Sequence, residues 1–276
     1  MSDPVTYAGV LPIGEFTALS LARLLADERR RRGTRGSRRA LGPFKQAVLI
    51  LRWLLDATRI SRLALDNDIS VATVYRYLHE GIDVLAATAP GLRGALLAAR
   101  AAGHTRVHLD GTLITTDRCR AVGPTAGVDL WWSGKHHRHG GNIQVVTAPD
   151  GWPLWTSEVR PGREHDTTCA RTHPGLLDEL AAWTDDGHAA LADLGYEGEA
   201  DRLTVPFKPQ PGHGRTVDQR TVNMLHSATR AVAERGNALL KTTFKALQRV
   251  TLCPWRIGAI TAAALVVLHI EYCRTT

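Results

Sequence analysis

Three acidic residues, far apart in the sequence, stand at positions where a fold could bring them together. Asp110 and Asp193 each follow a short apolar run, which is typical of the exit from a buried strand. Glu234 lies in a proline-free stretch, Val217 to Leu247, that is predicted to form one long helix. Grouped carboxylates repel one another and raise each other's pKa unless cations lie between them. This pattern therefore indicates a site for divalent cations.

The chemistry expected of such a site is displacement at phosphorus. Mg²⁺ or Mn²⁺ prefers oxygen ligands and leaves coordination positions open for phosphate. Of two such ions, one could activate water or a 3′-hydroxyl while the other stabilises the leaving oxygen. We therefore predict a two-ion site formed by Asp110, Asp193 and Glu234, which requires no protein nucleophile.

The predicted helix carries two positively charged side chains on the face that holds Glu234. At 100° per residue, Arg230 and Lys241 both lie within a narrow arc of that carboxylate. We expect both side chains to hold phosphates of the strand being cut. The alternative is that the charged stripe is only the solvent-facing side of an amphipathic helix.

A second cluster of basic residues lies between the two aspartates. Lys135, Arg138 and His139 belong to the segment Lys-His-His-Arg-His, which is predicted to be a DNA-contacting loop supported by Asn142 and Gln144. The competing interpretation is that its three histidines bind a transition metal. No carboxylate or cysteine stands nearby at a regular ligand spacing, which disfavours this interpretation.

The composition indicates a positively charged protein with one arginine-rich segment. The chain has 276 residues, which is enough for one large domain plus a small one. Its formal charge is +7 and its pI is near 9.6, so the protein is basic. Residues 29 to 39 contain seven arginines and no acid, which predicts a mobile arm or frayed helix end. Such an arm could bind phosphate or serve only as a solubilising tail. The four cysteines are irregularly spaced, which favours a reducing cytosol over disulfides or zinc. With DNA as its partner, the protein is expected to be cytoplasmic and nucleoid-associated.

The N-terminal region resembles a DNA-binding bundle. Helices are predicted over Phe16–Leu25, Phe44–Leu55, Arg59–Leu65 and Val71–Ala87, with a linker helix over 90–103. The third and fourth are joined by a tight turn, and Ser70 is a candidate cap, so the pair has a helix-turn-helix signature. Tyr75 and Arg76 would then face the groove, while Ser70 and Thr73 could contact phosphate. An ordinary helical bundle is the alternative.

The rest of the chain is predicted to be a mixed sheet with helices packed on it, the α/β class. One helix, Thr167–Trp183, is expected to be capped by Asp166. The apolar stretch Ile257–Ile270 is short for a membrane span and is predicted to be a buried helix. The expected strands are residues 106–110 with a continuation to 115, then 142–148, 152–159, 188–193 and 203–207.

One short motif points to a different enzyme class. Residues 109–113 read Leu-Asp-Gly-Thr-Leu, as in phosphatases of the haloacid-dehalogenase type. Those enzymes need a nucleophilic aspartate two positions before the aspartate of the motif, and this chain has His108 there. Without that nucleophile the aspartyl-phosphate route fails, so phosphatase activity is not expected.

Taken together, the motifs resemble those of DDE-superfamily transposases of bacterial insertion sequences, in the group related to Harbinger elements. The match runs from about Gly42 to Tyr272. The segments that carry it are His108–Thr112, Ser133–Gly140 with Asn142 and Gln144, Pro161–Asp166, Ala192–Tyr196, and the helix with Arg230, Glu234 and Lys241. The tyrosine of the related signature is replaced here by Ser227, and the His165–Asp166 pair has no role that the sequence explains.

The resemblance implies a ribonuclease-H-like catalytic domain over 103–276, a helix-turn-helix domain over 41–102 and an N-terminal segment with the arginine arm over 1–40. It also implies cutting and joining of DNA at terminal inverted repeats and target sites, dependent on two Mg²⁺ or Mn²⁺ ions. Asp110, Asp193 and Glu234 would be the acidic triad, in a homodimer or larger assembly on DNA. The alternative is a catalytically silent or domesticated DNA-binding regulator that retains the fold.

Overall fold

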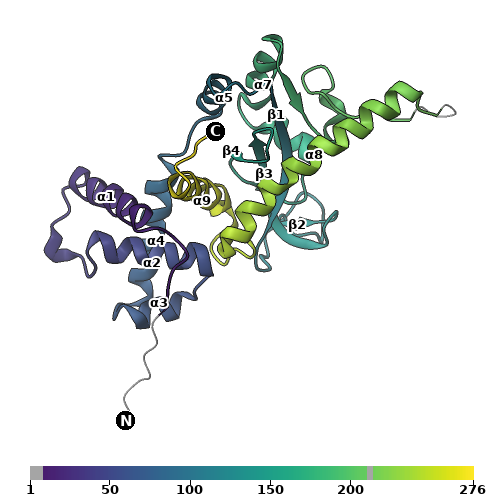
Figure 1. Ribbon diagram of the computed structural model, residues 1–276. Helices are drawn as coiled ribbons and strands as arrows, with labels where there is room; N and C mark the ends of the chain where they lie inside the picture. Colours follow the sequence, from purple (N-terminus) through teal and green to yellow (C-terminus); the bar gives the residue numbers. More distant parts are fainter. Residues whose placement is uncertain (1–8, 210–213) are drawn as a thin grey trace.

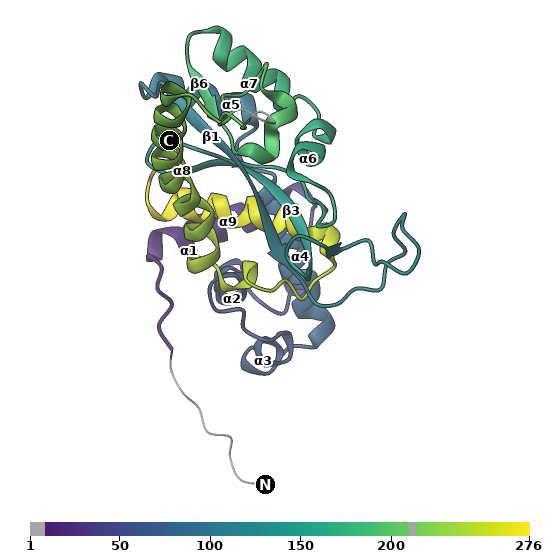
Figure 2. The same ribbon diagram turned by 90° about the vertical axis from the view of Figure 1, so that its right-hand side faces the viewer.

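The computed structural model describes residues 9–209 and 214–276. Figures 1 and 2 show a cluster of helices from the first third of the chain beside a twisted mixed sheet, with one long helix lying across the sheet. The α/β class with helices packed on a mixed sheet is therefore confirmed.

The N-terminal helices lie close to the expected segments. They are α1 (Glu15–Arg31), a 3₁₀ turn (Gly36–Arg38), α2 (Pro43–Asp56), α3 (Ile60–Asp66), α4 (Val71–Ala86) and α5 (Leu92–Ala101). Ser70 caps α4 as predicted, because its hydroxyl accepts a hydrogen bond from the Thr73 amide at 3.1 Å. Behind that cap, Val74, Tyr77 and Leu78 are buried, which anchors α4 against its neighbours.

The prediction of a mobile arginine arm is wrong at both of its ends. Helix α1 continues to Arg31, and Arg31 and Arg32 each pair with Glu28, which lies one helical turn before them. Arg29 is buried and donates hydrogen bonds to the Leu41 carbonyl at 3.0 Å and to Gln46 at 2.6 Å.

Glu80 is the anchor that orders the far end of this segment. Both of its carboxylate oxygens accept from Arg39, at 2.8 and 2.6 Å, and one also accepts from Gln46 at 2.9 Å. Although burial opposes ionisation, these donors lower the pKa of Glu80 overall. Two of the seven arginines are therefore structural, whereas five, at positions 30, 31, 32, 35 and 38, are exposed.

The sheet is centred on β1 (Arg106–Thr115). It pairs antiparallel with β3 (Arg138–Thr147) on one side and parallel with β6 (Ala189–Leu191) on the other. The remaining strands, β2 (Trp132–Ser133), β4 (Pro153–Thr156) and β5 (Arg160–Pro161), all pair with β3. The predicted strand 203–207 is wrong in extent, since among the described residues it is reduced to a parallel bridge between Thr204 and Leu191.

The helix expected over Thr167–Trp183 is two helices. They are α6 (Asp166–Thr172) and α7 (Leu176–Asp185), and Pro174 and Gly175 stand between them. Pro174 cannot continue the backbone ladder, and Gly175 has a φ of 74°, which a glycine adopts readily. The predicted capping role of Asp166 is also wrong: His165 occupies the N-cap position, and the Asp166 carboxylate is engaged elsewhere.

Two helices complete the chain. Helix α8 (Val217–Thr243) opens with a reciprocal capping box between Thr216 and Gln219, and ends before the predicted Leu247. Helix α9 (Ile257–Glu271) packs against α4, α1 and β4. The stretch Pro254–Glu271 is long and apolar enough to cross a membrane, yet 67% of it is buried inside the protein, as predicted for a core helix.

The C-terminal helix ties the helical cluster to the sheet. The carboxylate of Glu271 accepts hydrogen bonds from the Gly14 amide at 3.0 Å and the Thr17 hydroxyl at 2.6 Å. Arg256, just before α9, donates to Asp83 of α4 at 2.6 Å. The division of the chain at residues 40 and 102 stays a prediction, and residues 1–8 of its first part lie outside the described residues.

We predict that Glu80→Ala destabilises the fold by about 3 kcal/mol, because it leaves the partly buried Arg39 and the buried Gln46 without their acceptor. Urea denaturation measures this loss. Asp27→Ala is the control, since that carboxylate is 59% exposed and its removal should change stability by less than about 0.5 kcal/mol. Equal effects of the two substitutions would contradict the anchoring role of Glu80.

Candidate active site

Asp110 lies within β1, and Asp193 lies two residues past the end of the neighbouring strand β6. β1 and β6 run parallel with His108 opposite Leu191, so two residues further on the two aspartates face the same edge of the sheet. Burial is the main reason that the pKa of Asp110 rises to about 6, and the charge of Asp193 adds to the shift. The predicted apposition of these two carboxylates is therefore seen in the structure.

Each of the two aspartates is fixed by a different partner. Asn237, on α8, donates a hydrogen bond from Nδ2 to Asp110 Oδ2 at 2.7 Å. Asp193 precedes a 3₁₀ segment, Leu194–Glu199, and its Oδ1 accepts from the Gly195 amide at 2.7 Å. The second oxygen of Asp193 faces Arg230, whose Nη2 lies 3.9 Å away.

Glu234 lies at the edge of the site, and the guanidinium group of Arg230 lies between it and Asp193. The Nη2 atom of Arg230 is 3.3 Å from Glu234 Oε1 and 3.9 Å from Asp193 Oδ2, so one guanidinium nitrogen faces both carboxylates. The Glu234 side chain is 62% exposed. Within residues 9–209 and 214–276, no three His, Cys, Asp or Glu side chains lie close enough together to hold a metal ion. The structure thus places Asp110 beside Asp193, whereas the guanidinium of Arg230 separates Glu234 from Asp193.

Two polar residues in the site were missed by the sequence prediction. Asn237 occupies the α8 face that also carries Arg230, and the 3.6-residue period could have identified it had amides been considered beside carboxylates. Asp166 was assigned to a helix cap, but its carboxylate accepts from Asn142 at 2.6 Å and pairs with Lys135 at 3.3 Å. Its charge also contributes to the raised pKa of Asp110.

Lys241 reaches the site from the next turns of α8. Its ammonium donates to the Thr112 hydroxyl at 2.6 Å, which places the cation beside β1 just past Asp110. Burial lowers the pKa of Lys241, while the nearby charge of Asp110 acts in the opposite direction. Arg230 and Lys241 therefore flank the carboxylates on the helix face that the spacing predicted.

A hollow beside the aspartates is lined by basic side chains. Gly111, Leu113, Lys135 and His136 line both halves of it; one half reaches Asp166 and the other reaches Arg138 and Lys241. Lys135 and Arg138 are exposed here, as a phosphate-contacting loop requires. His139 is turned inward, because it pairs with Asp129 at 3.0 Å and packs edge-on against Trp132.

The supporting role predicted for Gln144 stays a prediction, and its side chain lies inside the protein. Gln144 is 1% exposed, and its side chain is hydrogen-bonded to Tyr196 and to Asn142, so no DNA can reach it.

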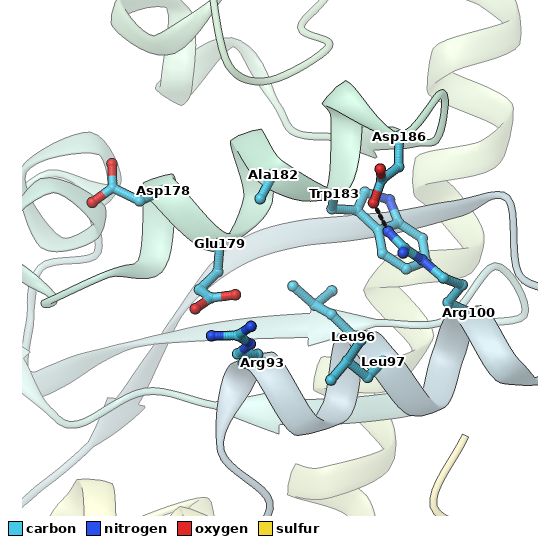
Figure 3. A pocket seen from close by; sticks show the side chains of 9 residues that line it. All are labelled: Arg93, Leu96, Leu97, Arg100, Asp178, Glu179, Ala182, Trp183 and Asp186. Atoms are coloured by element: carbon cyan, nitrogen blue, oxygen red, sulfur yellow. Dashed lines mark hydrogen bonds and ion pairs between the residues drawn. The ribbon is translucent and has the colours of Figure 1, made fainter.

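A separate hollow lies between α5 and α7, away from these groups. Figure 3 shows Leu96, Leu97 and Trp183 at its base and charged residues around its rim. Arg100 pairs with Asp186 across one end. The pocket is lined by none of the carboxylates near β1, so it is not the candidate site.

We predict that Asp110→Asn stabilises the metal-free protein at neutral pH. The folded-state pKa of about 6 lies above the ordinary 3.8, so the native protein loses stability as pH rises through that interval. At pH 7 the substitution should add about 1–3 kcal/mol to the free energy of unfolding, and below pH 4 it should add little. Urea denaturation between pH 4 and 8 without divalent ions measures this. A gain that does not change with pH, or an equal gain in the exposed Asp178→Asn control, would contradict the account.

Comparison with known proteins adds the family. The family model described as DDE superfamily endonuclease matches residues 109–269, which is more than half of the chain. The matched range contains Asp110, Asp166, Asp193 and Glu234. No curated protein was found to match the chain in sequence.

Two solved structures give distant matches. One is a Mos1 transposase paired-end complex with left transposon end, at 10% identity and a TM-score of 0.21, covering 98% of this chain and 82% of that one. The other is a pre-cleavage Mos1 transpososome, at 11% identity and a TM-score of 0.19, covering 99% and 82%. TM-scores this low do not establish a common fold, so the assignment rests on the family match alone. On that match, the chain belongs to the DDE superfamily endonucleases.

Proposed function

We propose that the chain is a transposase-type DNA endonuclease that cuts and joins the ends of an insertion element with divalent metal ions. The observation that carries this proposal is the pair of carboxylates, Asp110 and Asp193, held together where β6 ends beside the middle of β1. Two partly buried acids side by side are unfavourable unless a cation joins them or one of them is protonated. Family membership supports the same conclusion.

The donor set fits Mg²⁺ or Mn²⁺ better than a softer metal. The residues that would hold the ions are Asp110, Asp193 and Glu234, all of which offer hard oxygen atoms. When bound, two such ions supply the charge that activates the attacking oxygen and stabilises the leaving oxygen of a phosphodiester. Arg230 now lies between Asp193 and Glu234, and its movement would let Glu234 join the pair.

The basic groups around the carboxylates account for DNA as the substrate. Lys135, Arg138 and Lys241 line the hollow beside Asp110, where they would hold the phosphates next to the one being cut. Lys241 is fixed by Thr112, so its charge is already in place before DNA arrives. Arg230, once moved from its carboxylate partners, would contact the same backbone.

The helical cluster would supply the remaining DNA contacts. α3, the turn after it and α4 would act as a helix-turn-helix, and Tyr75 and Arg76 are exposed on the first turns of α4. Ser70 and Thr73 stand at the helix start, where hydroxyls and free amides suit a phosphate. A ribonuclease-H-like catalytic domain and a dimer or larger assembly on DNA belong to the same proposal.

Asp193→Ala should abolish metal-dependent cleavage while leaving DNA binding intact. The substrate is a plasmid carrying the sequences that flank the coding region, incubated with Mg²⁺ and, separately, Mn²⁺. We expect strand cleavage to fall by roughly 10³-fold or more, because the carboxylate acts mainly on the transition state. Glu234→Gln should behave in the same way.

The control for this experiment is Asp178→Ala, which removes a carboxylate that is 82% exposed on α7. Gel-shift measurements establish that each variant still binds the plasmid ends. Cleavage by Asp193→Ala at the control rate would contradict the assignment of the site. Binding by the wild-type protein without any cleavage would favour a silent, regulatory relative instead.

The exposed arginines after α1 should add sequence-independent affinity for DNA. Replacing Arg35 and Arg38 by Gln should reduce the slope of log K against log salt by about 0.9 for each phosphate that is no longer neutralised. These positions are chosen because Arg29 and Arg39 hold the fold. Fluorescence anisotropy between 50 and 200 mM salt, about the range where such slopes are steep, measures the change. An unchanged slope, or an equal change when Arg93 and Arg100 of α5 are replaced, would contradict it.

A further inference from the structure

Buried polar side chains behind the carboxylate pair form a hydrogen-bonded chain that ends on Asp166. Tyr196 donates its hydroxyl proton to Gln144, and Gln144 Nε2 donates to Asn142 Oδ1 at 2.9 Å. Asn142 Nδ2 donates in turn to Asp166 Oδ1 at 2.6 Å. Every donor in this chain points toward the carboxylate, an arrangement in which successive hydrogen bonds strengthen one another.

This hydrogen-bonded chain connects three separate parts of the fold. Tyr196 belongs to the 3₁₀ segment after Asp193, Gln144 and Asn142 belong to β3, and Asp166 is the first residue of α6. Tyr196, Gln144 and Asn142 are 0%, 1% and 6% exposed. Removing one of them would leave its buried neighbour without a hydrogen-bonding partner, which would destabilise the fold. The hydrogen-bonded chain therefore fixes the Asp166 carboxylate relative to the 3₁₀ segment that Asp193 caps.

Two glycines show how closely Asp166 approaches the other acids. A Cβ added to Gly111, the residue after Asp110, would lie 2.2 Å from Asp166 Oδ1. A Cβ added to Gly195 would lie 2.7 Å from Asp193 Oδ1 and 3.7 Å from Asp166 Oδ2. Asp166 thus lies directly over the backbone of β1. Its carboxylate and that of Asp193 both lie near the position that a side chain at residue 195 would occupy. Only residues without a side chain permit this approach.

An unpartnered buried acceptor at the same place points to a ligand. Asn237 is 8% exposed, and its Nδ2 is used by Asp110. Across the described residues its Oδ1 finds no hydrogen-bond donor. An unpartnered amide oxygen beside Asp110 is the kind of hard oxygen ligand that Mg²⁺ and Mn²⁺ prefer.

We infer that Asp166 is a positioning residue of the divalent-cation site, held near Asp110 and Asp193 by the hydrogen-bonded chain from Tyr196 through Gln144 and Asn142. This inference rests on the proposed function, because it adds a positioning residue to the same site. Lys135, 3.3 Å from Asp166 Oδ2, balances the extra charge until a cation or a DNA phosphate enters. The same lysine lines the basic hollow, so phosphate binding there would release Asp166 toward the cation.

The test measures Mn²⁺ binding to the full-length protein without DNA, from the decrease in the paramagnetic resonance signal of free Mn²⁺. Asp166→Asn keeps the shape of the side chain and removes its charge. We expect it to weaken Mn²⁺ binding by roughly 10- to 100-fold, the range found for groups that support a metal site. Asp66→Asn, which removes a carboxylate paired with Arg52 far from the sheet, should leave binding unchanged.

A second variant tests the hydrogen-bonded chain without touching the carboxylate. Tyr196→Phe removes the first donor, and we expect Mn²⁺ binding to weaken less than in Asp166→Asn. A purely structural role for Asp166 would lower the melting temperature without metal while leaving Mn²⁺ affinity at the wild-type value. That result, in either variant that folds, would overturn the inference.

Two further variants separate this inference from the proposed function. Asp110→Asn and Asp193→Asn should each weaken Mn²⁺ binding at least as much as Asp166→Asn does. If both bind Mn²⁺ as the wild type does, the proposed cation site itself fails. If they lose binding while Asp166→Asn retains it, the site stands and Asp166 is excluded from it.

Discussion

The site depends on two carboxylates that neighbouring strands hold side by side. The parallel register of β1 and β6 leaves Asp110 and Asp193 at one edge of the sheet, and burial removes the water that would otherwise screen them. In the metal-free chain the opposing charge comes from Arg230, 3.9 Å from Asp193. Such an arrangement costs stability and is retained where function needs it. A divalent cation would remove that cost and would bind for the same reason.

The remaining elements of the fold position groups around this pair. α8 lies across the sheet (Figure 1). From one face of this helix, Arg230, Asn237 and Lys241 reach Asp193, Asp110 and Thr112, respectively. α9 fixes the helical cluster to the same body through Glu271 and Arg256. DNA bound to the exposed start of α4 would therefore be held by a scaffold that also carries the carboxylates.

The sequence predicted what depends on local patterns and missed what depends on distant contacts. The Ser70 cap, the Asp110–Asp193 apposition and the charged face of α8 follow from spacing, and all are observed. The ordering of Arg39 could not be predicted, because its partner Glu80 is remote in sequence. Asp166 was misassigned for the same reason, since a helix start suggests a cap unless its partner on β3 is known. The break at Pro174 was visible in the sequence and was overlooked.

The central claim is that the carboxylate pair is a cation site, and a crystal soaked in Mn²⁺ tests it most directly. An anomalous difference map should show a peak within bonding distance of one oxygen from each of Asp110 and Asp193, with the Arg230 guanidinium moved away and Glu234 turned inward. No peak between the two aspartates at saturating Mn²⁺, with Arg230 still beside Asp193, would contradict the account.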